Sequence, residues 1–329
     1  MADTTPTSNE RMVMWWKIFS RMLASATLLF AVLFFIDLDI LFERIASLDP
    51  IWVSIALLAT LPQYFLSAAR WQLTAERLGA KLLFRVALPE YYLAVLTNQL
   101  LPGGILGDAT RAVRHGHRLK TRDSSLRYGP AIRAVIFERA SGQLILFIFM
   151  LAGLFFWPTM PQGQMSSIEI GGTVLFFVLI VGALLFILIK GPFRHSRFGI
   201  STLVFFKQAG HALLARDVVF LQFLYSLSVL TTYLFCFYCA ARAIGIAMSF
   251  SEVVAFVPAI LLSMTIPITI AGWGIREASA AAIWGLANLT PTNGVAISVT
   301  YGIIVLLSAM PGIFFVFPRL GQRDIGDNR

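Results

Sequence analysis

Long runs of apolar residues, separated by short polar stretches, fill most of the chain. Six of these runs reach the roughly 20 residues that a helix needs to cross a bilayer core of about 30 Å. They predict membrane-spanning helices at 18–36, 51–69, 131–157, 170–189, 217–244 and 294–318. The first run follows basic residues, as a signal peptide would, but no small-residue cleavage site comes after it, so we interpret it as an uncleaved helix.

Two further apolar segments, 87–101 and 253–270, are interrupted or directly followed by proline and glycine. These residues free backbone groups that lipid cannot satisfy, so such segments are typical of re-entrant or broken helices that line a cavity. The predicted fold class is therefore all-α. We expect a polytopic membrane protein with six full spans and two re-entrant segments, in one transmembrane domain over 1–329 with short cytoplasmic tails at 1–15 and 320–329.

The composition agrees with lipid as the solvent. Hydrophobic residues make up 58% of the chain and charged residues 13%, with a mean hydropathy of +0.78. Water-soluble domains carry about 25% charged residues, so a soluble enzyme is excluded. The net charge of +9 comes from short clusters between apolar runs, which indicates orientation at a membrane and argues against a nucleic-acid partner.

The distribution of Lys and Arg predicts which segments face the cytoplasm. The stretches 70–86, 105–130 and 190–216 are basic and are predicted to be cytoplasmic, whereas 37–50 and 158–168 are predicted to be external. Six spans then place both termini in the cytoplasm.

A repeated sequence pattern indicates an internal duplication. Pro102–Arg111 and Pro267–Arg276 share the pattern P-x4-G-x3-R, 165 positions apart, and the flanking spans repeat at a similar offset. We predict two halves, 15–160 and 168–320, each with an odd number of crossings. The second half would then be inverted relative to the first, with a binding site near the midplane.

Charged residues lie at or inside the apolar segments: Glu90, Asp108, Glu252 and the two adjacent pairs Glu138-Arg139 and Arg276-Glu277. Neighbours on a helix point about 100° apart, so neither adjacent pair is expected to satisfy itself. We expect Glu138 to reach Arg276, or Arg139 to reach Glu277, across the interface of the halves. Glu138 should face protein because small residues share its helix face: Ala131, Ala134, Ser141 and Gly142. The alternative is a buried ion pair that only fixes helix register.

The glycine-rich turns predict an anion site. We expect Asp108 to be the N-cap of a helix that carries Arg111, so that free backbone N–H groups and a guanidinium could bind a lipid phosphate. The candidate phosphate-binding residues are Arg111, Arg139, Arg276, Gly103, Gly104, Gly107, Gly272 and Gly274, and the structural or coupling charges are Asp108, Glu138 and Glu277. The alternative is that the glycines only permit tight turns. No catalytic residue, metal or cofactor is expected, and the apolar pair Cys236 and Cys239 is assigned to helix packing.

The sequence resembles the lysylphosphatidylglycerol synthase transmembrane-region family, flippase-like membrane proteins that include hopanoid-associated members. The blocks that carry the resemblance are Arg70-Trp71 with Leu78-Gly79, Asn98 with Leu101–Arg111, Glu138-Arg139 with Gly142, and Pro267 with Gly272–Glu277. The resemblance implies a bacterial inner-membrane protein that moves a lipid or lipid-linked head group between leaflets. In bifunctional relatives a soluble aminoacyl-transfer domain follows this region. Only about ten residues follow the last span here, so no synthase activity is expected.

Three classes of function remain open at this stage. The first is a flippase or transporter for a phospholipid or a polyprenyl- or hopanoid-type lipid, with a central charged cavity. The second is a membrane-embedded transferase that uses Asp108, Glu138 or Glu277 as general base. The third is a scaffold that recruits a soluble lipid-synthesis enzyme through the basic segment Arg111 to Arg133.

Overall fold

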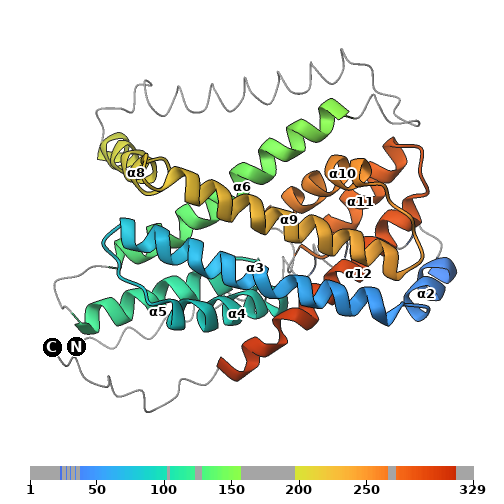
Figure 1. Cartoon of the computed structure of the whole chain (residues 1–329), viewed down its shortest axis with the longest axis horizontal. Coiled ribbons are helices and arrows are strands. Elements are labelled where there is room, and N and C mark those ends of the chain that lie inside the picture. The colour runs from blue at the N-terminus through green and yellow to red at the C-terminus, as the bar shows by residue number, and fades with distance from the viewer. Residues whose placement is uncertain are drawn as a thin grey trace.

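The computed structural model describes residues 38–101, 104–122, 128–156, 197–265 and 272–315, together with four helical positions between 23 and 34. These residues form α-helices and one 3-10 helix, and no strand occurs among them, which confirms the all-α prediction (Figure 1). The helices are α2 (Leu38–Ala46), α3 (Pro50–Arg77), α4 (Phe84–Leu100), α5 (Leu106–Arg122), α6 (Gly129–Phe156), α8 (Arg197–Leu213), α9 (Val219–Ala243), α10 (Phe250–Ser263), α11 (Ile275–Leu286), α12 (Pro291–Ala309) and η3 (Met310–Phe315).

Four stretches are long and apolar enough to cross a membrane: Pro50–Arg77, Gly129–Leu154, Val219–Ala243 and Pro291–Phe315. They coincide with four of the six predicted spans. The other two predicted spans, 18–36 and 170–189, lie outside the described residues apart from the isolated positions near the N-terminus, and so does the predicted external segment 158–168.

Helix α3 continues further than its apolar run. The prediction ended this span at residue 69 and assigned Arg70 to a cytoplasmic loop, but the helix runs to Arg77 and Arg70 is buried. The assignment was wrong because a charged side chain does not end a helix when a neighbouring element supplies its partner. Similarly, the basic segment after residue 105 is mostly a helix, α5, and the segment after 190 includes α8.

Helices α3 and α9 lie side by side and run in opposite directions (Figure 1). Polar contacts join them along their whole length. The backbone N–H of Asp49 donates to the Ala243 carbonyl at one end, and Arg77 pairs with Asp217 at the other. This antiparallel pair forms the central contact of the molecule.

Each of the two segments that were predicted to be broken contains the first helix of a helical hairpin, and the second helix follows it in the chain. Helices α4 and α5 pack together in the left half of Figure 1, and α10 and α11 pack together in the right half. Gly107 makes the first hairpin tight, since a Cβ atom there would clash with the Ala94 carbonyl oxygen. The turn of the first hairpin includes Gly104 with φ +59°, and that of the second includes Gly272 and Gly274 with φ +80° and +89°.

The hairpins pack reciprocally on the long helices. Helix α4 lies against η3 at the end of α12, and α10 lies against α6. Both contacts are close at a glycine: a Cβ atom on Gly312 would lie 2.7 Å from the Tyr92 carbonyl oxygen, and one on Gly153 would lie 2.8 Å from Cα of Ala255.

Helices α3 and α9 also end in the same way. Gly79 and Gly245 each follow the last turn with φ +73°, and each donates its N–H to the carbonyl three residues earlier. The next residue in each case donates to the carbonyl five residues earlier, which completes a Schellman motif. The two glycines lie 166 positions apart, close to the 165 positions that separate the two copies of the repeated sequence pattern.

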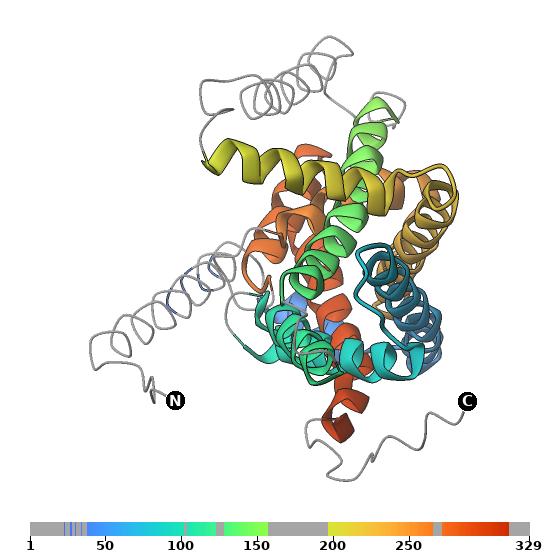
Figure 2. The ribbon, with the colours of Figure 1, turned by 90° about the vertical axis from the view of Figure 1, so that its left-hand side faces the viewer.

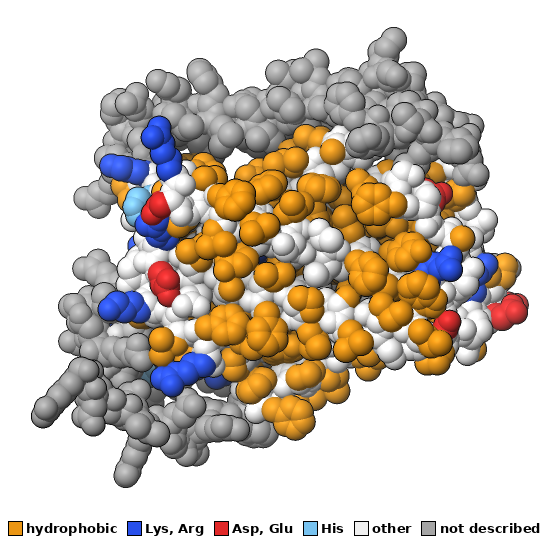
Figure 3. All heavy atoms as spheres, viewed as in Figure 1, with side chains coloured by type: hydrophobic (Ala, Val, Ile, Leu, Met, Phe, Trp, Pro, Cys, Tyr) orange, Lys and Arg blue, Asp and Glu red, His pale blue; other side chains and the backbone are white. Residues whose placement is uncertain are grey.

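The surface is divided into an apolar middle and charged ends. In the view of Figure 3, hydrophobic side chains cover the middle of the molecule, and Lys, Arg and His side chains gather mainly at the left end. Exposed apolar residues occur on the candidate spans, for example Leu58 at 64%, Leu144 at 54% and Phe220 at 74%. Helix α8 crosses the other helices at this basic end (Figure 2), and its exposed Val204 and Phe206 add to the apolar surface.

A candidate anion site in the buried charge cluster

Glu138, on α6, lies at the centre of a buried ion-pair cluster. Its Oε1 atom accepts from Nη2 of Arg70 at 2.6 Å, and its Oε2 atom accepts from Nη2 of Arg111 at 2.6 Å. Its side chain is completely buried, as expected from the small residues on its helix face. Two guanidinium groups from α3 and α5 therefore neutralise one carboxylate inside the protein.

Asp108 extends the cluster to a third arginine. Its Oδ1 atom accepts from Nε of Arg111 at 2.9 Å, and its Oδ2 atom lies 2.7 Å from Nη2 of Arg139. We call the five residues Arg70, Asp108, Arg111, Glu138 and Arg139 the arginine cluster. The sequence prediction placed four of these residues at a candidate site, and the ion pairs bring all four together.

Other side chains fix the geometry of the arginine cluster. The guanidinium of Arg111 lies over two rings, 4.7 Å from the centroid of Trp71 and 4.8 Å from that of Tyr91. Asn98 donates to Asp108 and accepts the N–H of Gly107, so it links the end of α4 to the start of α5. The planar guanidinium can stack on aromatic rings, and the ammonium group of Lys cannot stack in this way.

A second charge site lies in the other half, where Arg276 and Glu277 pair with each other. Nη2 of Arg276 lies 2.6 Å from Oε1 of Glu277, and both side chains have no exposed surface. Ser298 bridges the pair, with its Oγ atom 2.9 Å from Nε of Arg276 and 3.1 Å from Oε1 of Glu277. The guanidinium again lies over two rings, 4.6 Å from Trp273 and 5.7 Å from Tyr301. We call Arg276, Glu277 and Ser298 the closed pair.

The predicted pairing across the halves is therefore wrong. Glu138 bonds to Arg70 and Arg111 rather than to Arg276, and Arg139 bonds to Asp108 rather than to Glu277. The argument that adjacent residues cannot meet failed at the closed pair. Glu277 turns back to accept the N–H of Gly274, and the long Arg276 side chain then reaches it.

Two details of the predicted helix starts also need correction. Helix α5 begins at Leu106, so Asp108 is its third residue and not its N-cap. Two of the expected free backbone donors are already in use, because the N–H of Gly107 donates to Asn98 and that of Gly274 donates to Glu277. Gly103 lies outside the described residues. The described candidate glycines thus shape turns and close contacts, and the arginines remain as the candidates for anion binding.

The arginine cluster carries an excess of positive charge. It holds three guanidinium groups and two carboxylates, which leaves a net charge of +1. Nη1 of Arg111 and Nε of Arg139 are buried and have no hydrogen-bond partner. Arg139 is also 36% exposed, although it is the tenth residue after Gly129 and thus about 15 Å along the span. The cluster has donors and charge left for an anion.

Sequence reasoning missed several partners. Arg70 escaped because it follows the apolar run, although its spacing from buried Ser67 and Thr74 on the same helix face could have revealed it. Glu90 was recognised as a charge in an apolar segment, but its partners Arg114 and Arg118 of α5 were not predicted. The buried Cys236 and Cys239 are free thiols, in agreement with a packing role. No group of three metal-ligating side chains lies together in the described part of the chain.

The apolar surface, the four long helices and the charges held inside them define a multi-pass integral membrane protein. Residues 21–312 match the family described as the lysylphosphatidylglycerol synthase TM region, and the chain belongs to this family. No curated protein and no solved structure matches the chain.

Proposed function

We propose that this protein binds the phosphate of an anionic membrane lipid at the arginine cluster and moves the lipid head group between leaflets. The observation that carries the proposal is Arg139, a partly exposed guanidinium about halfway along a candidate span. An exposed cation in contact with hydrocarbon is costly, so such a residue faces a polar path or a ligand. A lipid phosphate supplies both the negative charge and the acceptor atoms.

The charge balance supports an anion over a cation as ligand. One phosphate with a single negative charge would balance the net charge of +1 in the arginine cluster. Arginine matches phosphate through its planar, two-pronged arrangement of donors. The Nε atom of Arg139, which has no partner, is one donor available for such contacts.

Two inverted repeats form part of the proposal. The reciprocal packing of α4 on η3 and of α10 on α6 is the pattern that a two-fold axis between the halves would produce. The matching Schellman motifs and the two arginines that each lie over two rings support the same relation. In this arrangement the two helical hairpins are re-entrant segments that enter from opposite sides, and the spans 18–36 and 170–189 complete six crossings.

The basic end of the molecule sets the proposed orientation. Lys and Arg favour the cytoplasmic side, so the end that holds α8 and the C-terminal end of α5 faces the cytoplasm of a bacterial inner membrane, as do both termini. The lipid is proposed to be a phospholipid or a lipid phosphate of the polyprenyl or hopanoid type. A lipid-synthesis enzyme that supplies it is a natural partner.

Reconstitution tests the proposal. Purified protein in vesicles with a fluorescent phosphatidylglycerol should expose inner-leaflet label to an added quencher faster than protein-free vesicles do. Arg139→Gln should slow exchange about tenfold, since it removes a charge-assisted contact with the phosphate.

The matched control is Arg85→Gln, which removes the same charge at an exposed position at the start of α4. Its exchange rate should equal that of the wild type. Equal rates for protein-containing and empty vesicles would refute lipid movement. An unchanged rate in Arg139→Gln would remove the arginine cluster from the path.

A further inference from the structure

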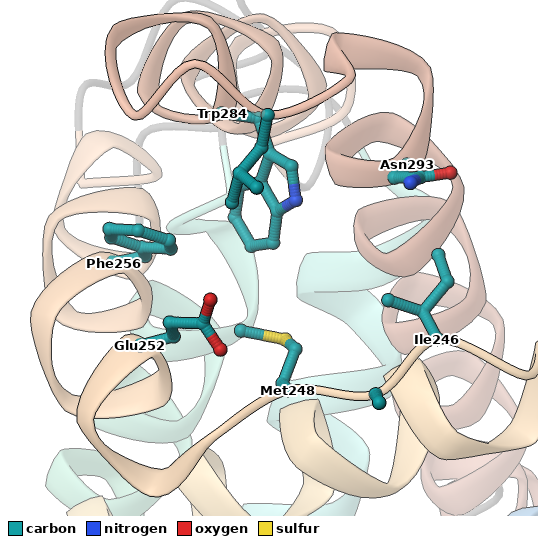
Figure 4. A pocket seen from close by; sticks show the side chains of 8 residues that line it. Ile246, Met248, Glu252, Phe256, Trp284 and Asn293 are labelled. Atoms are coloured by element: carbon teal, nitrogen blue, oxygen red, sulfur yellow. The ribbon is translucent and has the colours of Figure 1, made fainter. Parts of the chain in front are cut away.

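A small cavity lies far along the chain from the arginine cluster, among segments of the second half. It has a volume of about 120 Å³ and is surrounded by the α9–α10 connection, α10, α11 and the start of α12 (Figure 4). The lining residues are Ile246, Ala247, Met248, Glu252, Phe256, Trp284, Leu289 and Asn293. An apolar cavity of about 150 Å³ accepts benzene, so this one holds a group of about five non-hydrogen atoms.

The charge of the cavity comes from Glu252. Its Oε2 atom accepts hydrogen bonds from the backbone N–H and the hydroxyl of Ser249, at 2.6 and 2.8 Å. The first of these bonds, together with the bond from the Glu252 backbone N–H to Oγ of Ser249, forms a capping box at the start of α10. No Lys or Arg of the described residues forms an ion pair with Glu252. The carboxylate therefore gives this cavity a negative charge that the described side chains leave unbalanced.

Two aromatic rings, like the carboxylate of Glu252, favour a cation in the cavity. Phe256 and Trp284 pack against each other with their ring centroids 5.1 Å apart, and both line the cavity beside Glu252 (Figure 4). Ring faces attract cations, most strongly where water is excluded. A carboxylate next to two rings favours a cationic group over a neutral group of equal size.

The lining also separates one type of cation from another. A primary ammonium has three N–H donors that each need an acceptor. Six of the eight lining residues are apolar or aromatic, and the polar ones are Glu252 and Asn293. A quaternary ammonium presents methyl groups instead and needs no acceptor, so it fits this wall without leaving a donor unsatisfied.

We propose that this cavity binds a quaternary ammonium group, either from a lipid head group or from a free methylated amine. The inference does not depend on the proposed lipid movement. The cavity is formed by other residues and would bind a cation, whereas the arginine cluster is proposed to bind an anion.

The test measures binding of choline to purified protein in a maltoside detergent, by saturation transfer to the ligand methyl protons. Choline and tetramethylammonium should bind in a saturable way. The neutral analogue 3,3-dimethylbutan-1-ol has the same shape without the charge and should bind about fivefold more weakly. Absent or non-saturable choline binding, or equal affinity of choline and the neutral analogue, would overturn the proposal.

Variants locate the site. Glu252→Gln should abolish the difference between choline and the neutral analogue, while the capping box is kept because Gln also serves at this position. Phe256→Leu should weaken choline binding and retain a side chain of similar polarity. Glu43→Gln, an exposed position on α2, is the matched charge control and should bind like the wild type. A preference for choline that survives in both cavity variants would reject this cavity as its site.

A second arm separates the two sources of the group. In nanodiscs of phosphatidylcholine, a cavity that receives lipid head groups should no longer take up free choline, whereas nanodiscs of phosphatidylglycerol should leave uptake unchanged. Equal uptake in both lipids assigns the cavity to a free amine. Lipid exchange in vesicles of phosphatidylglycerol should be unaffected by Glu252→Gln, so failure here is distinguishable from failure of the proposed function.

Discussion

The arginine cluster and the closed pair contain the same types of residue but differ in their net charge. In each, a fully buried arginine lies over two aromatic rings and bonds to a carboxylate. The closed pair has one positive and one negative charge, and neither side chain has exposed surface. The arginine cluster has three positive and two negative charges, and Arg139 is exposed at its edge.

This difference separates a structural role from a binding role. In the closed pair, Glu277 also accepts the N–H of Gly274, and Arg276 also bonds to Ser298. Nη1 of Arg276 is buried without a hydrogen-bond partner, but the charges of the pair cancel. A balanced and inaccessible pair can fix how α11 sits on α12 but has no charge left for a ligand. The arginine cluster fixes α3, α5 and α6 together and still has an excess charge. In the proposed function, the arginine cluster therefore binds the ligand and the closed pair fixes helix register.

The largest expected effect is that of Glu138→Gln on stability. The change leaves Arg70 and Arg111 buried without their shared carboxylate, and breaking such a buried pair costs about 3–5 kcal/mol. The midpoint of thermal unfolding in detergent should fall sharply. Adding Arg70→Met returns the net charge to +1 and should recover part of the loss.

Glu76→Gln provides the control, because Glu76 is an exposed residue of α3. It should change the free energy of unfolding by no more than about 0.5 kcal/mol. If Glu138→Gln is as mild as this control, the carboxylate does not hold the arginine cluster together.

The next prediction compares the two sites by making the same substitution, Arg to Lys, in each. Arg276→Lys loses both the ring stacking and the paired bonds to Glu277 and Ser298, and should cost about 2 kcal/mol of stability. Lipid exchange by the folded protein should stay at the wild-type rate. Arg139→Lys should slow lipid exchange and change stability less. Its side chain is partly exposed and so contributes less to folding, and in the proposed function its planar donors contact the phosphate.

Both variants should be measured for unfolding and for lipid exchange in vesicles of one lipid composition. The assignment fails if Arg276→Lys slows exchange and Arg139→Lys does not. Equal effects of the two variants on both measurements would show that the sites are not specialised.

The sequence predicted the elements of this fold better than their contacts. Four spans follow directly from apolar length, because a helix must cover the hydrocarbon core. The two hairpins follow from proline and glycine in otherwise apolar segments. Such features are local, so a single sequence reveals them.

The partners of the charges could not be predicted in this way. Glu138 was correctly expected to face protein, but its partner Arg70 lies 68 positions away on another helix. Angular spacing excluded the pair Arg276 and Glu277, yet side-chain length overcame the angle. The cavity around Glu252 combines separate segments, none of which has a distinctive sequence pattern. Which side chains meet depends on how helices are rotated against each other, and apolar length carries no such information.

A smaller effect is expected at the two Schellman glycines, where the halves should behave alike. Gly79→Ala and Gly245→Ala place a Cβ at φ +73° with no other atom within 4 Å, so any loss is conformational. Each should cost about 1–2 kcal/mol. Gly210→Ala, inside helix α8 with open space around it, should instead stabilise by about 0.5–1 kcal/mol. Clearly unequal losses at positions 79 and 245 would argue against equivalent helix ends.

The smallest expected effect is a pH dependence in the first hairpin, at His115 of α5. Burial is the main cause that lowers the pKa of His115 below its usual value of 6.5, and its ring packs edge-on against Trp71. As the pH falls through 6.5, the unfolded chain takes up a proton that the folded protein still excludes, so stability should decrease. His115→Gln should flatten this part of the profile of unfolding midpoint against pH between 5 and 8. His117→Gln, on the exposed side of the same helix, is the matched control and should keep the wild-type slope. If the two variants give the same slope, the acid sensitivity of the protein arises at another group.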